Sequence, residues 1–93
     1  MASPTIDSSN TPLEFPCRYP VKVMGPATEA FEQEVREIIQ NFVAPLEESD
    51  ITRRASRKGT YVSLTFTVHA ASRDHLEKIY QRLHTHKDVM QTL

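Results

Sequence analysis

Cysteine, glycine and tryptophan are scarce in this 93-residue chain, which has one cysteine, two glycines and no tryptophan. With Cys17 alone, the chain can form no internal disulfide and cannot hold an iron–sulfur cluster through a set of thiolates. A single thiol is typical of a protein from a reducing cytoplasm. No hydrophobic run approaches the roughly 20 apolar residues of a membrane-spanning helix. The start of the chain also lacks the basic and apolar segments of a secretory signal, so we expect a cytoplasmic protein without a membrane span.

Composition divides the chain into two parts. Residues 1–14 are mostly Ala, Ser, Thr, Pro, Asp and Asn, and after Met1 their only sizeable apolar side chains are Ile6 and Leu13. Such a segment buries too little apolar surface to offset the entropy cost of ordering, so we expect a disordered N-terminal tail. The remaining residues, 15–93, have the composition of one small globular domain.

The clearest structural signal lies between Tyr61 and His69. From Val62 to Val68, an aliphatic or aromatic residue alternates with a hydroxyl residue at every position. Because successive side chains of a strand point to opposite faces, this pattern predicts a half-buried strand with one apolar and one polar face. The polar face is then open to solvent or to a partner.

The other expected elements follow from periodicity and from residues that start or end them. Two amphipathic stripes indicate helices, with Thr28 and Ser72 in the N-cap positions. Gly25-Pro26 is expected to end the first strand. Pro45 is expected to end the first helix, because the residue before a proline disfavours helical conformation. In chain order we expect a strand at 19–24, a helix after 28, strands at 51–56 and 61–69 joined by a turn at 57–59, a helix after 72, and a strand at 88–93.

This order of elements is that of the split βαβ, or ferredoxin-like, α+β fold. Right-handed crossovers place both helices on one face of a four-stranded antiparallel sheet, with the first and third strands at its centre. Arg53 and Arg54 would then lie on an edge strand, where charge discourages pairing with another chain. The expected core residues are Val21, Val23, Phe31, Val35, Ile38, Ile39, Phe42, Val62, Leu64, Phe66, Val68, Leu76, Ile79 and Leu83.

Charge is unevenly distributed, although the net charge is only −1. Residues 26–50 carry one basic and seven acidic side chains, a balance of 1 − 7 = −6. Residues 51–87 carry eight basic and two acidic side chains, a balance of 8 − 2 = +6. The simpler interpretation is that two solvated faces partly neutralise each other, and the alternative is a polar surface that orients a charged partner.

No arrangement of residues indicates catalysis or metal binding. No nucleophile–base pair or carboxylate dyad can be identified, so we do not expect an enzyme. His84 and His86 could supply two metal ligands, but no third ligand lies near them in sequence and His75 is two helical turns away. They are more typical of exposed residues at a helix end. We therefore expect no cofactor and no metal.

The hairpin also resembles an RNA-recognition pattern in part. Residues 58–64 read Lys-Gly-Thr-Tyr-Val-Ser-Leu, where the RNP1 pattern has aromatic residues on the exposed parity of the strand. Tyr61 alone has that parity in this strand, and Phe66 has the buried one. Nucleic acid is therefore not the expected partner.

Four segments of the chain resemble the YbeD family of small bacterial proteins of unknown function: Phe15-Pro16, Lys22-Val23-Met24-Gly25, Ser56-x-x-Gly59-x-Tyr61-x-Ser63, and Tyr80-x-x-Leu83. The resemblance implies a shape similar to that of ACT-type regulatory domains, no established catalytic residue, and a gene-context link to lipoate metabolism. An ACT-like domain would bind its ligand near the first strand–helix loop. In this sequence that position is Gly25, where the missing side chain permits close approach.

We therefore expect a small cytosolic regulatory or adaptor domain that binds a protein partner or a small metabolite without catalysis. The alternative is a weak RNA-binding module that uses the basic hairpin at 53–58 and the open sheet face. A weak homodimer through the same face or an edge strand is a further option, and so is a purely structural role for the two glycines and the hairpin. The expected binding residues are Lys22, Met24, Gly25, Lys58, Tyr61 and Ser63.

Overall fold

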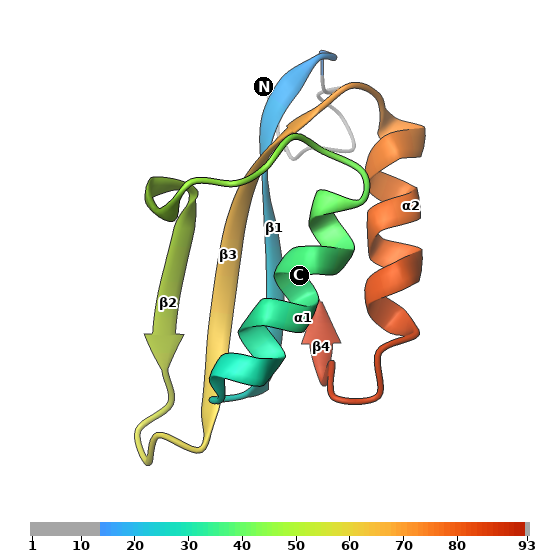
Figure 1. The fold of residues 1–93 in the computed structure, drawn as a ribbon. Helices are drawn as coiled ribbons and strands as arrows, with labels where there is room; N and C mark the ends of the chain where they lie inside the picture. Colours follow the sequence, from blue (N-terminus) through green and yellow to red (C-terminus); the bar gives the residue numbers. More distant parts are fainter. Residues whose placement is uncertain (1–13, 93) are drawn as a thin grey trace, which may run out of the picture.

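Two ten-residue strands, β1 (Cys17–Pro26) and β3 (Tyr61–Ala70), form the centre of the sheet in the computed structural model, which describes residues 14–92. They pair antiparallel along their whole length, from Cys17 opposite Ala70 to Pro26 opposite Tyr61. β2 (Ile51–Ala55) pairs with the other side of β3, and the two-residue β4 (Gln91–Thr92) pairs with the end of β1. The strand order is β2-β3-β1-β4, which confirms the ferredoxin-like arrangement (Figure 1).

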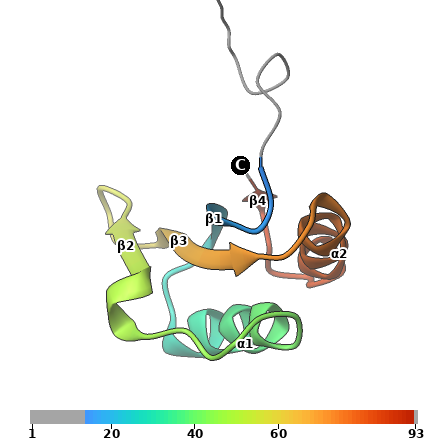
Figure 2. The same ribbon diagram turned by 90° about the horizontal axis from the view of Figure 1, so that it is seen from above.

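Both helices begin at the residues expected from the sequence. α1 (Glu29–Gln40) starts where the Thr28 hydroxyl oxygen accepts the N–H of Phe31 at 3.0 Å. α2 (Arg73–His84) starts where the Ser72 hydroxyl oxygen accepts the N–H of His75 at 3.1 Å. Figure 2 shows that the two helices lie on the same side of the sheet, which leaves the other side uncovered by helix.

The core lies between the helices and the apolar face of β3, as the alternating pattern predicted. Leu64, Phe66 and Val68 are completely buried, whereas the hydroxyl residues between them point to the opposite face. Three expected core residues, Ile38, Phe42 and Val62, are only partly buried against this cluster. The buried hydrophobic residues are Val21, Val23, Phe31, Val35, Ile39, Leu46, Ile51, Leu64, Phe66, Val68, Ala70, Leu76, Ile79 and Leu83.

The end of α1 differs from the expectation. The helix stops at Gln40 rather than continuing to Pro45. Beyond it the chain folds back, because the Leu46 N–H donates to the Gln40 side-chain oxygen at 2.7 Å and the Arg36 guanidinium donates to the Leu46 carbonyl. This return buries the Leu46 side chain in the core, a contact that an extended helix could not make.

The bounds of the first and last strands also differ from the expectation. β1 starts at Cys17 instead of Tyr19, and it ends at Pro26, so that Gly25 and Pro26 are its last two residues instead of the residues that follow it. The last strand is confined to Gln91–Thr92 instead of 88–93. Residues 1–13, which include most of the expected tail, and Leu93 lie outside the described residues. Among the described helices, none has the length and apolar character needed to cross a membrane.

Candidate functional site

The uncovered side of the sheet, which we call the open face, is formed by every second residue of the four strands. Strand alternation and the pairing register define its members, because residues opposite one another in neighbouring strands share a face. They are Arg18, Pro20, Lys22, Met24, Pro26, Thr52, Arg54, Tyr61, Ser63, Thr65, Thr67, His69 and Gln91.

A shallow hollow lies on this face near the hairpin. In the register, Met24 is opposite Ser63 and Gln91, and Ser63 is opposite Arg54, so these side chains form one row across all four strands. The hollow has a volume of about 160 Å³. Its lining residues are Met24, Arg54, Ala55, Ser56, Tyr61, Val62 and Ser63.

The structure brings together three of the six expected site residues in this hollow: Met24, Tyr61 and Ser63. Lys22 is exposed on the same face and pairs with Thr65, two residues along β1 from Met24. Lys58 is exposed in the hairpin turn and does not line the hollow, which has Arg54 as its cation instead.

Gly25 was expected in a loop beside the open face, and this placement is wrong. It lies within β1 on the buried face, next to the completely buried Val23 in the alternation of the strand. A Cβ atom on Gly25 would lie 2.2 Å from Cζ of Phe31. The missing side chain at Gly25 therefore allows the Phe31 ring of α1, and not a ligand, to approach the strand closely. This contact is part of the packing of the core.

The hairpin turn explains the Ser-x-x-Gly-x-Tyr spacing in physical terms. The Ser56 hydroxyl oxygen accepts the N–H of Tyr61 at 3.1 Å, and the Ser56 N–H donates to the Tyr61 carbonyl at 2.8 Å. Gly59 donates its N–H to the Ser56 carbonyl and has φ +73°, a left-handed conformation that favours glycine. The motif thus closes the turn and holds the backbone of Tyr61, whose side chain remains 43% exposed.

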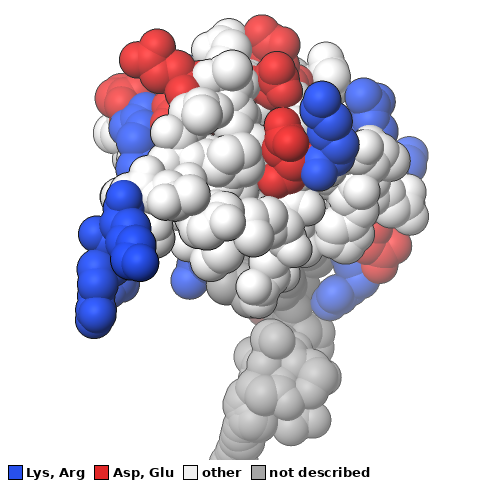
Figure 3. All heavy atoms as spheres, turned by 90° about the horizontal axis from the view of Figure 1, so that it is seen from below, with Lys and Arg blue, Asp and Glu red and all other residues white. Residues whose placement is uncertain are grey.

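The open face is cationic and carries no carboxylate at any of its positions. Arg18 lies 3.6 Å from Asp50, whereas Lys22 and Arg54 form no ion pair with residues 14–92. Figure 3 shows one group of basic side chains that projects from the surface, whereas other basic side chains lie beside acidic ones. The two charge blocks of the sequence meet at Arg53, which forms ion pairs with Glu32 and Glu48.

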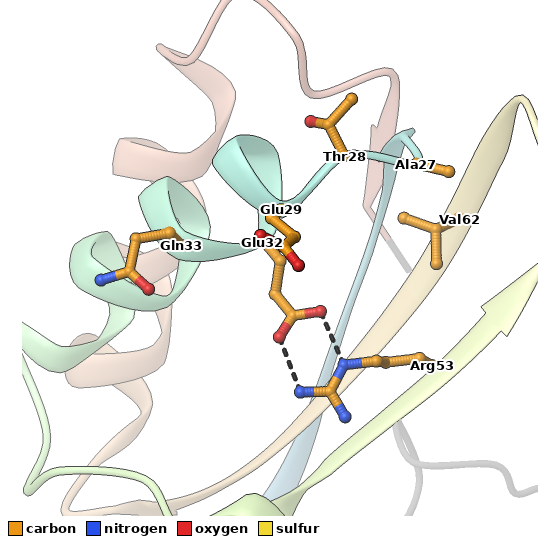
Figure 4. A pocket seen from close by; sticks show the side chains of 7 residues that line it. All are labelled: Ala27, Thr28, Glu29, Glu32, Gln33, Arg53 and Val62. Carbon is orange, nitrogen blue, oxygen red and sulfur yellow. Dashed lines mark hydrogen bonds and ion pairs between the residues drawn. The ribbon is translucent and has the colours of Figure 1, made fainter.

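A larger hollow of about 510 Å³ lies where β1 leads into α1 (Figure 4). Its cation, Arg53, is already engaged: Nε and Nη2 each lie 2.7 Å from a Glu32 carboxylate oxygen, and Nη1 lies 2.6 Å from Glu48. These bonds raise the pKa of Arg53 further above its ordinary value, and hydrogen bonding to Arg53 lowers the pKa of Glu48. The lining residues are Ala27, Thr28, Glu29, Glu32, Gln33, Arg53 and Val62.

Glu34, His86 and Asp88 form the one group of three potential metal ligands within residues 14–92, with ligand atoms within 4.8 Å of one another. The contacts of His86 argue against an ion there. Its Nδ1 accepts the Asp88 N–H at 3.1 Å, so the ring proton of the neutral imidazole resides on Nε2, which lies 2.6 Å from the Glu34 carboxylate. The hydrogen bonds to protein thus use both ring nitrogens. His84 instead contacts Thr92, so the two neighbouring histidines do not converge.

The fold and the open face define a small ferredoxin-like domain with an uncovered, basic sheet surface. Residues 10–93 match the family model described as "Protein of unknown function (DUF493)". A UPF0250 protein of Nitrosomonas europaea is 38% identical over 81 residues, which cover 87% of this chain and 93% of the relative. A UPF0250 protein of Chromobacterium violaceum is 37% identical over 87 residues, covering 94% of this chain and 98% of the relative.

The chain therefore belongs to the DUF493 family, the YbeD family of small bacterial proteins of unknown function. The family resemblance found in the sequence is confirmed. No solved structure gave a significant match.

Proposed function

We propose that this protein is a non-catalytic adaptor or regulatory domain that docks an acidic region of a protein partner on the open face of its sheet. The observation that carries the proposal is the charge of that face, which holds Lys22 and Arg54 without an ion-pair partner among residues 14–92, Arg18 at 3.6 Å from Asp50, and no carboxylate. A surface whose charges are all positive attracts an anionic partner and orients it during approach.

The side chains between these cations suit a reversible protein interface. Met24 offers an adaptable thioether, and Tyr61 offers a ring with a polar hydroxyl group. Serine and threonine hydroxyls occupy the intervening positions of β3. A mixed surface of this kind resembles the polar interfaces of transient complexes more than the apolar interfaces of obligate ones.

RNA is less well supported than an acidic protein. Single-stranded RNA is held mainly by bases stacked on several aromatic side chains, and each stacked base contributes about 1–3 kcal/mol. Tyr61 is the only aromatic residue other than His69 among the open-face positions. The ion pairs of Arg53 with Glu32 and Glu48 also remove one cation from the basic hairpin that the RNA alternative needs.

A small metabolite is the second candidate ligand, supported by the hollow beside the N-terminal end of α1. Its volume of about 510 Å³ is within the usual range for ligand pockets, roughly 300–1,000 Å³, whereas the hollow on the open face is smaller than this range. Its location also agrees with the strand–helix ligand position implied by the ACT-like resemblance. A metabolite screen in which ligands shift the amide signals of Thr28 and Gln33, and not those of the open face, would favour this candidate.

Binding of poly-L-glutamate, followed by amide chemical shifts, tests the proposal with a defined anionic probe. We expect shifts at Lys22, Ser63 and Thr65 that diminish at high salt, where screening weakens surface attraction. Reversal of two open-face charges, Lys22→Glu with Arg54→Glu, should abolish them. The matched reversal on exposed α2, Lys78→Glu with Arg82→Glu, should leave them unchanged.

The RNA alternative predicts a different outcome from the same variants. A mixed-sequence oligoribonucleotide that binds more tightly than poly-L-glutamate and loses its affinity in Tyr61→Ala would contradict the proposal. If a protein partner is sought directly, the lipoate link implied by the family resemblance makes proteins of that process the first candidates to examine.

A further inference from the structure

The edge of β1 beyond β4 is unpaired among the described residues. β1 spans ten residues, and β3 pairs with all of them, but β4 pairs with only Val23 and Met24. No other segment within residues 14–92 pairs with this side of β1 from Cys17 to Lys22. Figure 1 shows β4 accompanying only the end of the strand. The sheet therefore has an edge at β1 although β1 is a central strand in the topology.

The backbone groups on this edge can be assigned from the antiparallel geometry. Alternate residues of such a strand direct both their N–H and C=O groups toward the same neighbour. The Met24 carbonyl accepts the Met90 N–H at 2.8 Å, which shows that Met24 faces the β4 side. Arg18, Pro20 and Lys22 have the same parity, so their backbone groups face the open edge.

Pro20 fits this assignment because proline lacks an N–H and is tolerated where no neighbouring strand needs one. The edge thus offers two N–H groups, from Arg18 and Lys22, and the carbonyls of Arg18, Pro20 and Lys22. An unpaired row of this kind is a template for an added strand.

We propose that this edge of β1 receives an extended segment of the partner, in which acidic side chains alternate with apolar ones. This inference rests on the proposed function and names the form in which the acidic partner binds. The added strand would pair with β1 in line with β4, on the same side of β1. Its alternate side chains would then lie beside Arg18 and Lys22 on the open face. A carboxylate beside Lys22 would complement a cation that has no ion pair within residues 14–92, and one beside Arg18 would add to the contact of Arg18 with Asp50 at 3.6 Å.

The opposite face of the added strand requires apolar residues. Tyr19 and Val21 have the buried parity of β1, and Tyr19 is only partly buried at this edge. Tyr80 of α2 is also partly buried, and Tyr19 lies close enough to contribute to the raised pKa of Tyr80. Apolar side chains on the inner face of an added strand would cover these two rings, whereas charged ones would lose their hydration there.

A second copy of this chain is a poorer occupant of the edge. Antiparallel pairing of two β1 strands about Pro20 would set Arg18 of one copy opposite Lys22 of the other on the same face. Like charges directly opposite across strands destabilise the pairing. Two prolines at the centre would also remove the N–H groups on both sides.

Hydrogen exchange with defined peptides tests this inference. The probe is a capped heptapeptide that alternates Glu and Val, and the control peptide replaces each Glu by Lys. We expect the Glu peptide to slow amide exchange at Arg18 and Lys22 by about tenfold or more at saturation, because these amides gain strand hydrogen bonds. The amide of Val21, which faces β3, should change little. Lys22→Glu should lower the affinity of the protein for the Glu peptide, while Lys78→Glu on α2 should leave this affinity unchanged.

Three results would overturn the inference. One is equal binding of the Lys peptide, and another is absence of binding by the Glu peptide at millimolar concentration. The third is self-association of the chain that protects Arg18 and Lys22 without any peptide. If the peptide fails but poly-L-glutamate still shifts Ser63 and Thr65, strand addition is wrong and the open-face function stands. If both fail, the proposed function is wrong as well.

Discussion

Gly25 and Phe31 are in direct contact across the β1–α1 junction, with the Phe31 ring occupying the space that any other side chain at position 25 would need. Phe31 is 1% exposed and cannot move outward without leaving the core. A residue that the family resemblance associated with ligand approach is thus committed to the packing of the strand against the helix.

Gly25→Ala is therefore expected to destabilise the protein by roughly 1–3 kcal/mol, the usual range for an overpacked core. In a Phe31→Leu background the same change should cost less, because the smaller side chain leaves room for the Cβ atom. Urea unfolding of the four proteins in this double-mutant cycle measures the coupling between the two positions. If the two substitutions lower the free energy of unfolding by strictly additive amounts, the Phe31 ring is not what excludes a side chain at position 25.

Gly59→Ala provides a contrast, because nothing lies within 4 Å of a Cβ atom at that position. Its expected cost of about 1 kcal/mol comes from backbone strain at φ +73°, since side chains with a Cβ atom disfavour this region. Gly59→Asn should cost less than Gly59→Ala, because asparagine tolerates the left-handed region better. Equal unfolding midpoints for the two variants would contradict this account of the turn.

The Arg53–Glu32 pair links β2 to α1 through two parallel hydrogen bonds of 2.7 Å. Arg53→Lys keeps the charge but cannot form this fork. Because the Arg53 side chain is 39% exposed, we expect a loss of at most about 1 kcal/mol. Arg54→Lys, one residue along on the opposite face, is the matched control and should leave the unfolding midpoint unchanged. If Arg54→Lys lowers the stability more than Arg53→Lys does, the loss comes from changing arginine in β2 and not from the pair with Glu32.

Tyr80 should make stability depend on pH in the alkaline range. Burial, and to a smaller extent neighbouring Tyr19, raises the pKa of Tyr80 to about 12 from a usual value near 10. Since the unfolded chain releases this proton more readily, folding stability is fully present below about pH 10 and falls as the pH rises toward about 12. Ultraviolet titration of the tyrosines checks this, with Tyr80→Phe expected to remove the late transition. If Tyr80→Phe removes an early transition instead, the shift is wrong.

Local patterns of the sequence were sufficient for much of the fold. The alternation from Val62 to Val68 reports burial directly, because each residue's face follows from strand geometry alone. Thr28 and Ser72 were identifiable as N-caps because capping is a contact over three residues. The open-face parity of Lys22, Met24, Tyr61 and Ser63 followed from the same reasoning.

Contacts between distant residues could not be found in this way. Arg53 and Glu32 are 21 residues apart, and nothing near either residue signals the pair. The end of α1 depends on Leu46 returning to the core, so Pro45 was a misleading local signal. Gly25 was misplaced because its short contact is with Phe31, which reaches position 25 only after α1 packs on the sheet.

Capture of a partner from native bacterial lysate, compared between matched variants, tests the central claim most directly. Immobilised wild type, the open-face double variant Lys22→Glu/Arg54→Glu and the α2 control Lys78→Glu/Arg82→Glu would each be exposed to nuclease-treated lysate, and the retained proteins quantified. We predict that a protein with an acidic surface is retained equally by wild type and control and is lost from the open-face variant. Retention by the open-face variant, with loss from the α2 control, would place the interface on the helices and contradict the account.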